Sequence, residues 1–293
     1  MRYTLRQLQV FLATAHHENI SLAAAELNMS QSAASSALKE LESQFDIQLF
    51  DRVGKRLQIN ELGHSLRPQA QALLDQASDL QSAFSQHQTP GDLKVGATLT
   101  IGNYLAVPIM SAYKKQHPGA QVALEVSNTE TIAKRVANFE LDIGLIEGEL
   151  QSPSLELIEW CEDELCVFAA PNDPLTKRRK ITDQHLLAAK WIVRESGSGT
   201  RQTFDRAMSG ILPDLNIELE LQHTEAIKRA VEAQLGIGCL SKVTLKEAFK
   251  RGSLKEIKIP QRNFKRRFYF VLHQQKYISA GIEKWISLCK KQR

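Results

Sequence analysis

Apolar residues recur every three or four positions over the first 45 residues, and this spacing predicts three short helices. Thr4 and Gln7 have the spacing of a capping box, which predicts the start of the first helix. Ser21 and Ser30 are expected to cap the second and third helices, with Asn28 in the turn between them. The apolar positions of the three predicted helices are Leu5, Leu8, Phe11, Leu12 and Ala15, then Leu22, Ala24, Ala25 and Leu27, then Ala34, Ala37, Leu38, Leu41 and Phe45.

The third predicted helix also has a polar side near its N-terminus. Two helices joined by a tight turn are typical of a helix-turn-helix, in which the second helix enters the DNA major groove. A solvated face on an ordinary three-helix bundle would give the same pattern. The candidate DNA-reading side chains on this side are Gln31, Ser32, Ser35, Ser36 and Lys39.

A basic hairpin is predicted after the three helices. Residues 49–59 have two apolar ends around a glycine, and Arg52, Lys55 and Arg56 lie near the predicted tip. Such a wing places cations on backbone phosphates. Residues 1–60 are therefore predicted to form a winged helix-turn-helix DNA-binding domain.

A long helix is predicted from Asn60, and residues 61–88 are assigned to this linker, or dimerisation, helix. Its apolar residues are spaced 4, 4, 3, 4, 3 and 4 apart, which is the seam of a coiled coil. Pro68 is expected to bend the helix or to mark where it settles. A second copy of the chain should cover the seam, so we expect a homodimer on a roughly palindromic site. The seam consists of Leu62, Leu66, Ala70, Leu73, Ala77, Leu80 and Phe84.

The pattern changes after Gln86–Gly91, a polar stretch ending in Pro-Gly that is typical of a hinge. Predicted strands then alternate with predicted helices, which indicates an α/β fold with a parallel sheet covered by helices. The predicted strands are 93–96, 121–126, 141–146, 165–169, 191–193, 217–221, 237–240 and 268–272. The predicted helices are 102–116, 129–139, one starting at 200, 224–234 and 278–290.

Three loops at predicted strand ends combine hydroxyls or amides with the start of a helix: 97–103, 127–129 and 195–201. Helix capping alone explains any one of them. Three at equivalent places predict an anion site, because strand ends gather ligands and helix starts favour negative charge. The glycine-rich loop is not a nucleotide P-loop, since Gly-Lys-Ser/Thr is absent. The candidate effector-binding residues are Thr98, Thr100, Asn103, Asn128, Thr129, Glu147, Ser196, Ser198, Thr200 and Arg201.

The two charged residues of this set are expected to have opposite effects on a bound anion. Arg201 is expected to add a charge-assisted bond to an anion. Glu147 would repel a fully charged anion unless it pairs with Arg201 or holds a proton, and it would equally select a partly protonated ligand. The basic run 262–267, which includes Arg266, is predicted to be a solvated loop before a strand.

Net charge alone does not indicate DNA binding. The chain carries a formal charge of +4, yet residues 1–88 hold seven Lys and Arg against nine Asp and Glu, a balance of −2. Affinity for DNA should therefore depend on where the cations lie, chiefly Lys39, Arg52, Lys55 and Arg56, and on the presence of two copies.

The sequence gives little support to other function classes. The four cysteines lack zinc-site spacing and no histidine lies in a nucleophile or metal motif, so neither an enzyme nor a metal or cofactor site is expected. A solute-binding protein would explain the second half of the chain but not residues 1–88. The absence of a leader and of a membrane-length apolar run predicts a cytoplasmic protein.

The motifs taken together resemble those of LysR-type transcriptional regulators. This resemblance implies a homodimer, commonly a dimer of dimers, that binds double-stranded DNA at an interrupted palindrome. It also implies a two-lobed, periplasmic-binding-protein-like effector domain at 91–293, with lobe 1 at about 91–161 and 267–293 and lobe 2 at about 162–266. The matching motifs are Leu8-x-x-Phe11, Ala23-Ala24-Ala25-Glu26-Leu27, Ser30-Gln31-Ser32-Ala33, Leu38-x-x-Leu41-Glu42 and Leu49-Phe50-x-Arg52.

The three candidate anion loops resemble more narrowly the LysR branch that senses sulfur oxyanions. This resemblance, carried by the Gly-Ser-Gly-Thr-Arg stretch at 197–201 and the Ser-Asn-Thr turn at 127–129, implies sulfite or sulfate as the effector. An organic carboxylate is the alternative.

Overall fold

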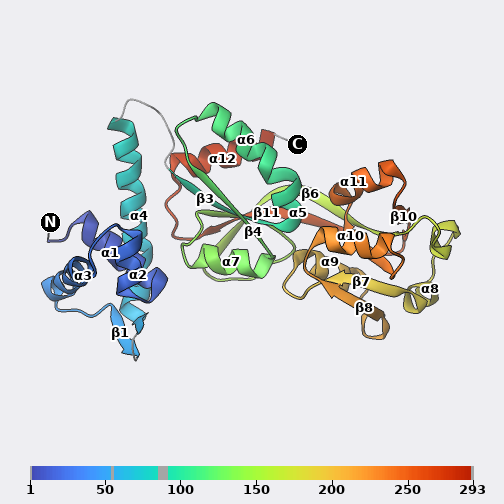
Figure 1. The fold of residues 1–293 in the computed structure, drawn as a ribbon, viewed down its shortest axis with the longest axis horizontal. Helices are drawn as coiled ribbons and strands as arrows, with labels where there is room; N and C mark the ends of the chain where they lie inside the picture. Colours follow the sequence, from blue (N-terminus) through green and yellow to red (C-terminus); the bar gives the residue numbers. More distant parts are fainter. Residues whose placement is uncertain (1, 54–55, 85–91, 292–293) are drawn as a thin grey trace.

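The computed structural model describes residues 2–53, 56–84 and 92–291 of the 293-residue chain. Lys55 of the predicted wing and the predicted hinge at Gln86–Gly91 lie outside the described residues. Figure 1 shows a helical domain at the N-terminus, a long helix α4 beside it, and a mixed α/β part that holds the rest of the chain.

The N-terminal domain has the predicted three helices and hairpin. The capping box of Thr4 and Gln7 is present, and the Ser30 hydroxyl accepts a hydrogen bond from Ala33 N. The expectation for Ser21 is wrong, because Asn19 caps the second helix by accepting from the backbone N–H groups of residues 21 and 22. Asn28 adopts the left-handed conformation (φ 53°) that the tight turn requires. The elements are α1 (Leu5–His17), α2 (Ile20–Glu26), α3 (Gln31–Phe45), β1 (Phe50–Val53) and β2 (Arg56–Ile59).

The core of this domain lies between its three helices and the start of α4. Four of the predicted apolar positions are exposed instead: Leu5 (47%), Leu22 (54%), Phe45 (42%) and Ala25, while Ala23 is buried. The fully buried apolar residues that pack together here are Leu8, Val10, Phe11, Ala15, Ala24, Ala34, Leu38, Leu41, Leu49, Phe50 and Ala70.

The predicted long helix is a single element, α4 (Glu61–Phe84). Asn60 caps it, because its side-chain oxygen accepts a hydrogen bond from Gly63 N at 2.9 Å. Pro68 lies within the helix without ending it.

The α/β part holds one continuous sheet whose middle strands run against their neighbours. The strand order is β4-β3-β5-β11-β6-β9-β7-β8, with β10 paired to β6. Strands at both ends of the sheet are parallel, but β11 is antiparallel to β5 and β6, and β6 is antiparallel to β9. The prediction of a purely parallel sheet is therefore wrong. The strands are β3 (Leu93–Thr98), β4 (Val122–Ser127), β5 (Ile143–Glu147), β6 (Leu155–Ala169), β7 (Lys190–Arg194), β8 (Asn216–Leu221), β9 (Ile237–Ser241), β10 (Lys255–Ile257) and β11 (Lys265–His273).

Helices cover both faces of this sheet. Figure 1 shows α6 and α12 on one face of the central strands and α7 on the other. A π-helical turn at Gly102–Ala106 joins α5 to α6, so that residues 99–116 are helical without a break. The helices are α5 (Leu99–Ile101), α6 (Val107–Gln116), α7 (Thr129–Ala137), α8 (Asp183–Ala188), α9 (Gly199–Ala207), α10 (Thr224–Glu232), α11 (Lys242–Arg251) and α12 (Ala280–Lys291).

Two sets of hydrophobic cores divide the α/β part into what we call lobe 1 and lobe 2. The lobe 1 cores contain Tyr113, Phe270 and Trp285, and the lobe 2 cores contain Trp191 and Phe204. The long strand β6 contributes to both, and the chain passes from one lobe to the other near residues 161–165 and 264–268. These crossings bring the strand ends of lobe 1 next to the helix starts of lobe 2.

Candidate functional site

The predicted anion loops converge where β3 and β5 end. These strands are parallel neighbours, with Ala97 opposite Leu145, so that Thr98 and Glu147 lie at the same edge of the sheet. The carboxylate-bearing Glu147 is only 1% exposed. Helix α9 of lobe 2 begins directly against this edge.

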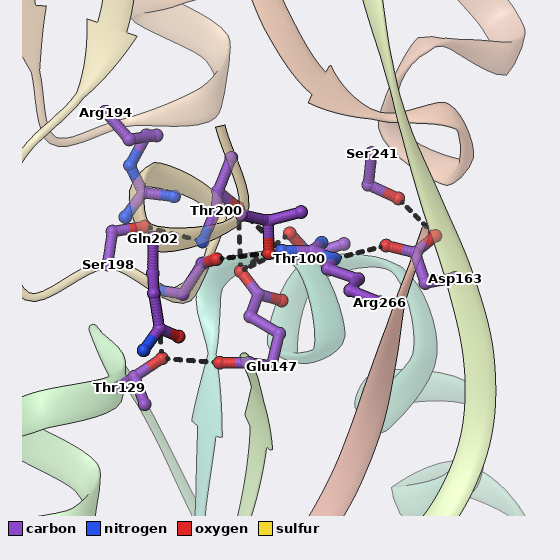
Figure 2. Close-up of polar contacts among 12 residues, drawn as sticks. Thr100, Thr129, Glu147, Asp163, Arg194, Ser198, Thr200, Gln202, Ser241 and Arg266 are labelled. Atoms are coloured by element: carbon purple, nitrogen blue, oxygen red, sulfur yellow. Dashed lines mark hydrogen bonds and ion pairs between the residues drawn. The ribbon is translucent and has the colours of Figure 1, made fainter. Parts of the chain in front are cut away.

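A buried ion-pair network surrounds Glu147 (Figure 2). Arg266, at the start of β11, lies with its guanidinium 3.4 Å from the carboxylate of Glu147 and 2.7 Å from that of Asp163. Asp163 also accepts a hydrogen bond from the Ser241 hydroxyl at 2.8 Å. The side chains of all three charged residues are at most 3% exposed, so their charges are held in a region shielded from water.

Two threonine hydroxyls connect the lobes through the same carboxylate oxygen. Thr100 donates to Glu147 Oε1 at 3.2 Å, and Thr200 donates to it at 3.0 Å. Thr200 accepts in turn from Arg266 at 2.9 Å. Thr100 belongs to lobe 1 and Thr200 to lobe 2, so the network spans the line between the lobes.

The start of α9 approaches the end of β5 so closely that only glycine fits at position 199. A Cβ on Gly199 would lie 1.9 Å from the backbone oxygen of Glu147. The Thr129 hydroxyl bridges the two segments, since it donates to the Glu147 carbonyl at 3.0 Å and accepts from Gly199 N at 3.2 Å. Ser198 caps α9 by accepting from Thr200 N.

Several buried polar atoms at this place lack a hydrogen-bond partner among the residues that the structure describes. They are one carboxylate oxygen of Glu147 (Oε2), one guanidinium nitrogen of Arg266 (Nη2) and, at the end of β3, the hydroxyl of Thr98. An unmet buried polar group costs about 1 to 3 kcal/mol. A small ligand that both accepts and donates hydrogen bonds would satisfy these atoms.

The candidate DNA-reading residues are arranged differently. All five on α3, together with Arg52 and Arg56 of the hairpin, are exposed, while Lys55 lies outside the described residues. The hairpin pairs Arg52 with Leu57, so that both arginines lie close to its tip. This surface has the hydrogen-bonding groups and cations that base edges and phosphates require.

Two protein-family models match separate parts of the chain and together cover most of it. Residues 5–64 match the family described as "Bacterial regulatory helix-turn-helix protein, lysR family", and residues 86–293 match "LysR substrate binding domain". The chain belongs to the LysR family of transcriptional regulators. It is therefore a DNA-binding regulator with an effector-binding domain.

Relatives and solved structures agree with this membership. The HTH-type transcriptional regulator YeiE of Escherichia coli is 40% identical over 289 residues, which cover 99% of this chain and 98% of YeiE. The regulatory domain of Synechocystis CcmR, solved in complex with 2-PG, is 28% identical with a TM-score of 0.64, covering 69% of this chain and 96% of that domain. Full-length OxyR from Pseudomonas aeruginosa has the same fold, with a TM-score of 0.76 at 20% identity and coverage of 99% and 95%.

The structure of this LysR-family regulator brings some of the predicted effector residues together and leaves others apart. Thr100, Thr129, Glu147, Ser198 and Thr200 gather at the inter-lobe network, and Thr98 is buried at the end of β3. Asn128 caps α7 by accepting from Thr131 N. Asn103 and Ser196 are exposed.

Arg201 does not form the pair with Glu147 that the sequence pattern allowed as one alternative. Its guanidinium binds Asp205 at 2.8 Å and Glu220 at 2.6 Å, and it also donates to the Arg194 carbonyl. Burial would lower the pKa of Arg201, but the hydrogen bonds that it donates to the carboxylates of Glu220 and Asp205 raise that pKa above its ordinary value. Arg201 therefore stabilises lobe 2 rather than the network around Glu147.

The cation of the site is Arg266, which the sequence interpretation placed in a solvated loop. β11 begins at Lys265, and its residues alternate between exposed and buried, with Arg266 on the same face as Phe268 and Phe270. The same alternation, with a period of two residues, extends the predicted strand 268–272 toward the N-terminus as far as Arg266. A second buried arginine, Arg194, was also missed; it forms a two-point ion pair with its neighbour Glu195.

The described residues contain neither a candidate metal site nor a candidate membrane-spanning helix. No cluster of His, Cys, Asp and Glu side chains in residues 2–53, 56–84 and 92–291 is arranged to hold a metal ion. None of the described helices has the length and apolar content needed to cross a membrane. No disulfide joins the four cysteines, all of which lie in the described part of the chain.

Proposed function

We propose that this regulator binds an interrupted palindrome in double-stranded DNA as a homodimer that assembles into a dimer of dimers. We propose further that it responds to a small anion held between its lobes. The observation that carries the proposal is the buried pair of Arg266 and Glu147, in which Arg266 Nη2 and Glu147 Oε2 have no hydrogen-bond partner among the described residues. Sulfite is the leading candidate and sulfate the next, on resemblance to the branch that senses sulfur oxyanions.

The unmatched atoms favour a particular kind of anion. Arg266 Nη2 and the Thr98 hydroxyl can donate to ligand oxygens, and the N-terminus of α9 adds a favourable dipole. Glu147 Oε2 is an acceptor and repels an oxygen that carries no hydrogen. A partly protonated oxyanion satisfies both sides, and so does an organic carboxylate that carries a hydroxyl group. The CcmR regulatory domain in complex with 2-PG supports a small-molecule ligand in a related domain.

Titration calorimetry on the full-length chain tests the anion proposal. Sodium sulfite, sodium sulfate and glycolate should be compared on the wild type and on Thr98→Val, which keeps the side-chain shape and removes a hydroxyl that has no partner in the described structure. We expect stability to be unchanged or slightly higher, while affinity for the bound anion falls by about 1 to 3 kcal/mol.

Ser287→Ala is the matched control, because Ser287 is exposed on α12, away from the network. It should bind like the wild type. Equal affinity in Thr98→Val would place the ligand elsewhere. Heat with glycolate but with neither sulfur oxyanion would favour the carboxylate alternative.

The dimer proposal rests on the exposed seam of α4. Its outer apolar residues are 40% (Leu62), 39% (Leu73), 56% (Leu80) and 77% (Phe84) exposed in the single chain. An apolar groove of about 410 Å³ lies beside them, lined by residues of α1, α3 and α4. Apolar seams of this spacing are covered by a second helix in a coiled coil. A second copy would place two copies of α3 for two half-sites.

A further inference from the structure

The linker helix α4 has a second, polar face that contacts lobe 1. Arg67, Gln71, Asp75 and Asp79 recur every four residues, which places them on one stripe, separate from the apolar seam. Arg67 donates to the Asn138 carbonyl of lobe 1 at 2.5 Å. At the other end of the stripe, Asp79 hydrogen-bonds the Tyr277 side chain.

Lys276 is the centre of this contact. Its ammonium group lies 2.9 Å from Asp75 of α4 and 2.8 Å from Asp142, which precedes β5. The lysine side chain is 2% exposed, whereas the two carboxylates are 18% and 21% exposed. Gln71 donates to the other oxygen of Asp75 at 3.0 Å and so orients it toward the lysine.

The charge on Lys276 binds the two domains to each other. Burial alone would lower the pKa of Lys276, but Asp142 and Asp75 raise it above its ordinary value, so the group stays an ammonium. A buried charge is tolerated only while its partners are present. Separating α4 from lobe 1 would remove one of the two carboxylates from a lysine that water does not reach.

The contact around Lys276 and the network around Glu147 lie at opposite ends of the same two strands. β5 (Ile143–Glu147) follows Asp142 and ends at Glu147, and β11 (Lys265–His273) starts beside Arg266 and runs toward Lys276. The strands are antiparallel, with Phe268 opposite Glu147. The Glu147–Arg266 pair thus lies at one end of the ladder and the Asp142–Lys276 pair at the other, about 17 Å apart at the usual rise per strand residue.

We propose that Lys276 is a positioning residue that holds the linker helix against lobe 1, and that β5 and β11 carry changes at the Glu147–Arg266 pair to this contact. The first half stands on the contacts of Lys276 alone, and the second rests on the proposed function of the inter-lobe site. Two hydrogen-bonded strands form a stiff element, so that rearrangement of one ion pair displaces the other. A ligand on Arg266 would in this way alter how α4, and the DNA-binding domain that it carries, is set on lobe 1.

Hydrogen exchange on the full-length protein tests the first half. In Lys276→Met we expect amides in 273–279 and in the middle of α4 to exchange about tenfold faster, because a buried ion pair has been broken. Lys246→Met removes an equivalent charge from an exposed position on α11 and should change neither segment. Unchanged exchange in Lys276→Met would overturn the assignment of Lys276.

A double-mutant comparison separates a specific pair from general loosening. Asp75→Asn alone should speed exchange in the same segments, and adding it to Lys276→Met should have little further effect, since the interaction is already lost. Additive effects would show that the two residues act independently and would contradict the pairing as a positioning contact.

The second half is tested from the other end of the strands, without a ligand. Glu147→Gln leaves Arg266 with one carboxylate fewer, and we expect faster exchange in 138–142 and 273–279 but not in α8 of lobe 2. Changes confined to the loops around the mutation would overturn transmission through β5 and β11. Calorimetry with sodium sulfite on the wild type reports the anion proposal separately, so that its failure leaves the exchange result interpretable.

Discussion

The DNA-binding surface and the inter-lobe network use similar side chains in opposite surroundings. On α3, the polar candidates Gln31, Ser32 and Ser35 are exposed. In the effector domain, the hydroxyls of Thr100 and Thr200 are at most 2% exposed and are tied to a buried carboxylate. Both groups lie near helix N-termini, where anions are favoured. The two groups differ in their surroundings: the α3 side chains are exposed to solvent, whereas the two threonine hydroxyls already form hydrogen bonds within the folded chain.

The comparison indicates different physical sources of affinity. The exposed surface gains its energy only when DNA arrives, through phosphate contacts that salt screens strongly. The buried network already holds two carboxylates against one guanidinium, and its interactions are less screened because water is excluded. Substitutions should therefore affect DNA affinity in the first region and protein stability in the second.

The largest expected effect is on stability in Arg266→Met. Removing the guanidinium leaves Glu147 and Asp163 buried without their cation, and breaking such a network costs about 3 to 5 kcal/mol. Urea denaturation of the full-length chain measures this loss. Arg178→Met, at an exposed position of lobe 2, is the control and should change stability by less than about 0.5 kcal/mol. Similar values for the two variants would remove the proposed contrast between buried and exposed sites.

A second large effect is expected in Leu73→Asp, which should leave the monomer folded and prevent dimerisation. Leu73 is 39% exposed in the single chain, so the substitution disturbs little within it. In the paired helices it would bury two facing carboxylates. Sedimentation of fragment 1–90, which contains a hydrophobic core of its own, measures the association. Leu73→Met should still dimerise, and a monomeric wild-type fragment at micromolar concentration would contradict the seam.

Intermediate effects are expected at the DNA surface. Ser35→Ala or Gln31→Ala should weaken specific binding by about 1 to 3 kcal/mol for each lost base contact and leave stability unchanged. Arg56→Ala should weaken specific and non-specific binding together and flatten the salt dependence. Fluorescence anisotropy with palindromic and random DNA at several salt concentrations distinguishes the two patterns. Intact specific affinity in Ser35→Arg would mean that this face of α3 does not meet the bases.

The same contrast explains which features the sequence could predict. The boundaries of α1 and α3 follow from capping residues and helical spacing within a few positions, so local pattern was sufficient. The exposed polar face of α3 follows from the same spacing. These features depend on neighbours in sequence.

The inter-lobe network could be predicted only in part, because its charges come from distant segments. Glu147 and Arg266 are 119 positions apart and meet only through the antiparallel pairing of β5 with β11. A sequence pattern that assumes parallel strands gives no reason to bring them together. Arg201, a cation within the predicted loop, was therefore the partner that the sequence offered for Glu147, whereas Arg266 makes this contact in the structure.

The smallest expected effect concerns pH and lies where the linker helix α4 meets lobe 1, between the DNA-binding surface and the inter-lobe network. His273 packs against Phe139, with ring centroids 4.2 Å apart, close to the contact between α4 and lobe 1. Burial, and then the charges of Arg67 and Lys276, lower the pKa of His273 below its ordinary value of 6.5. The unfolded chain therefore takes up a proton at a higher pH than the folded chain does. Stability contributed by this site is complete above about pH 6.5 and declines as the pH falls toward the lowered value.

Thermal unfolding between pH 7.5 and 5 in the wild type and in His273→Gln measures this term, with the pH range chosen to span the ordinary histidine value. The wild type should lose more stability than His273→Gln as the pH falls, because the variant has no group to protonate at this position. His64→Gln, an exposed position on the same linker helix, should keep the wild-type profile. Parallel profiles for the wild type and His273→Gln would mean that protonation does not weaken the contact. In that case the interface between α4 and lobe 1 would be insensitive to pH over this range.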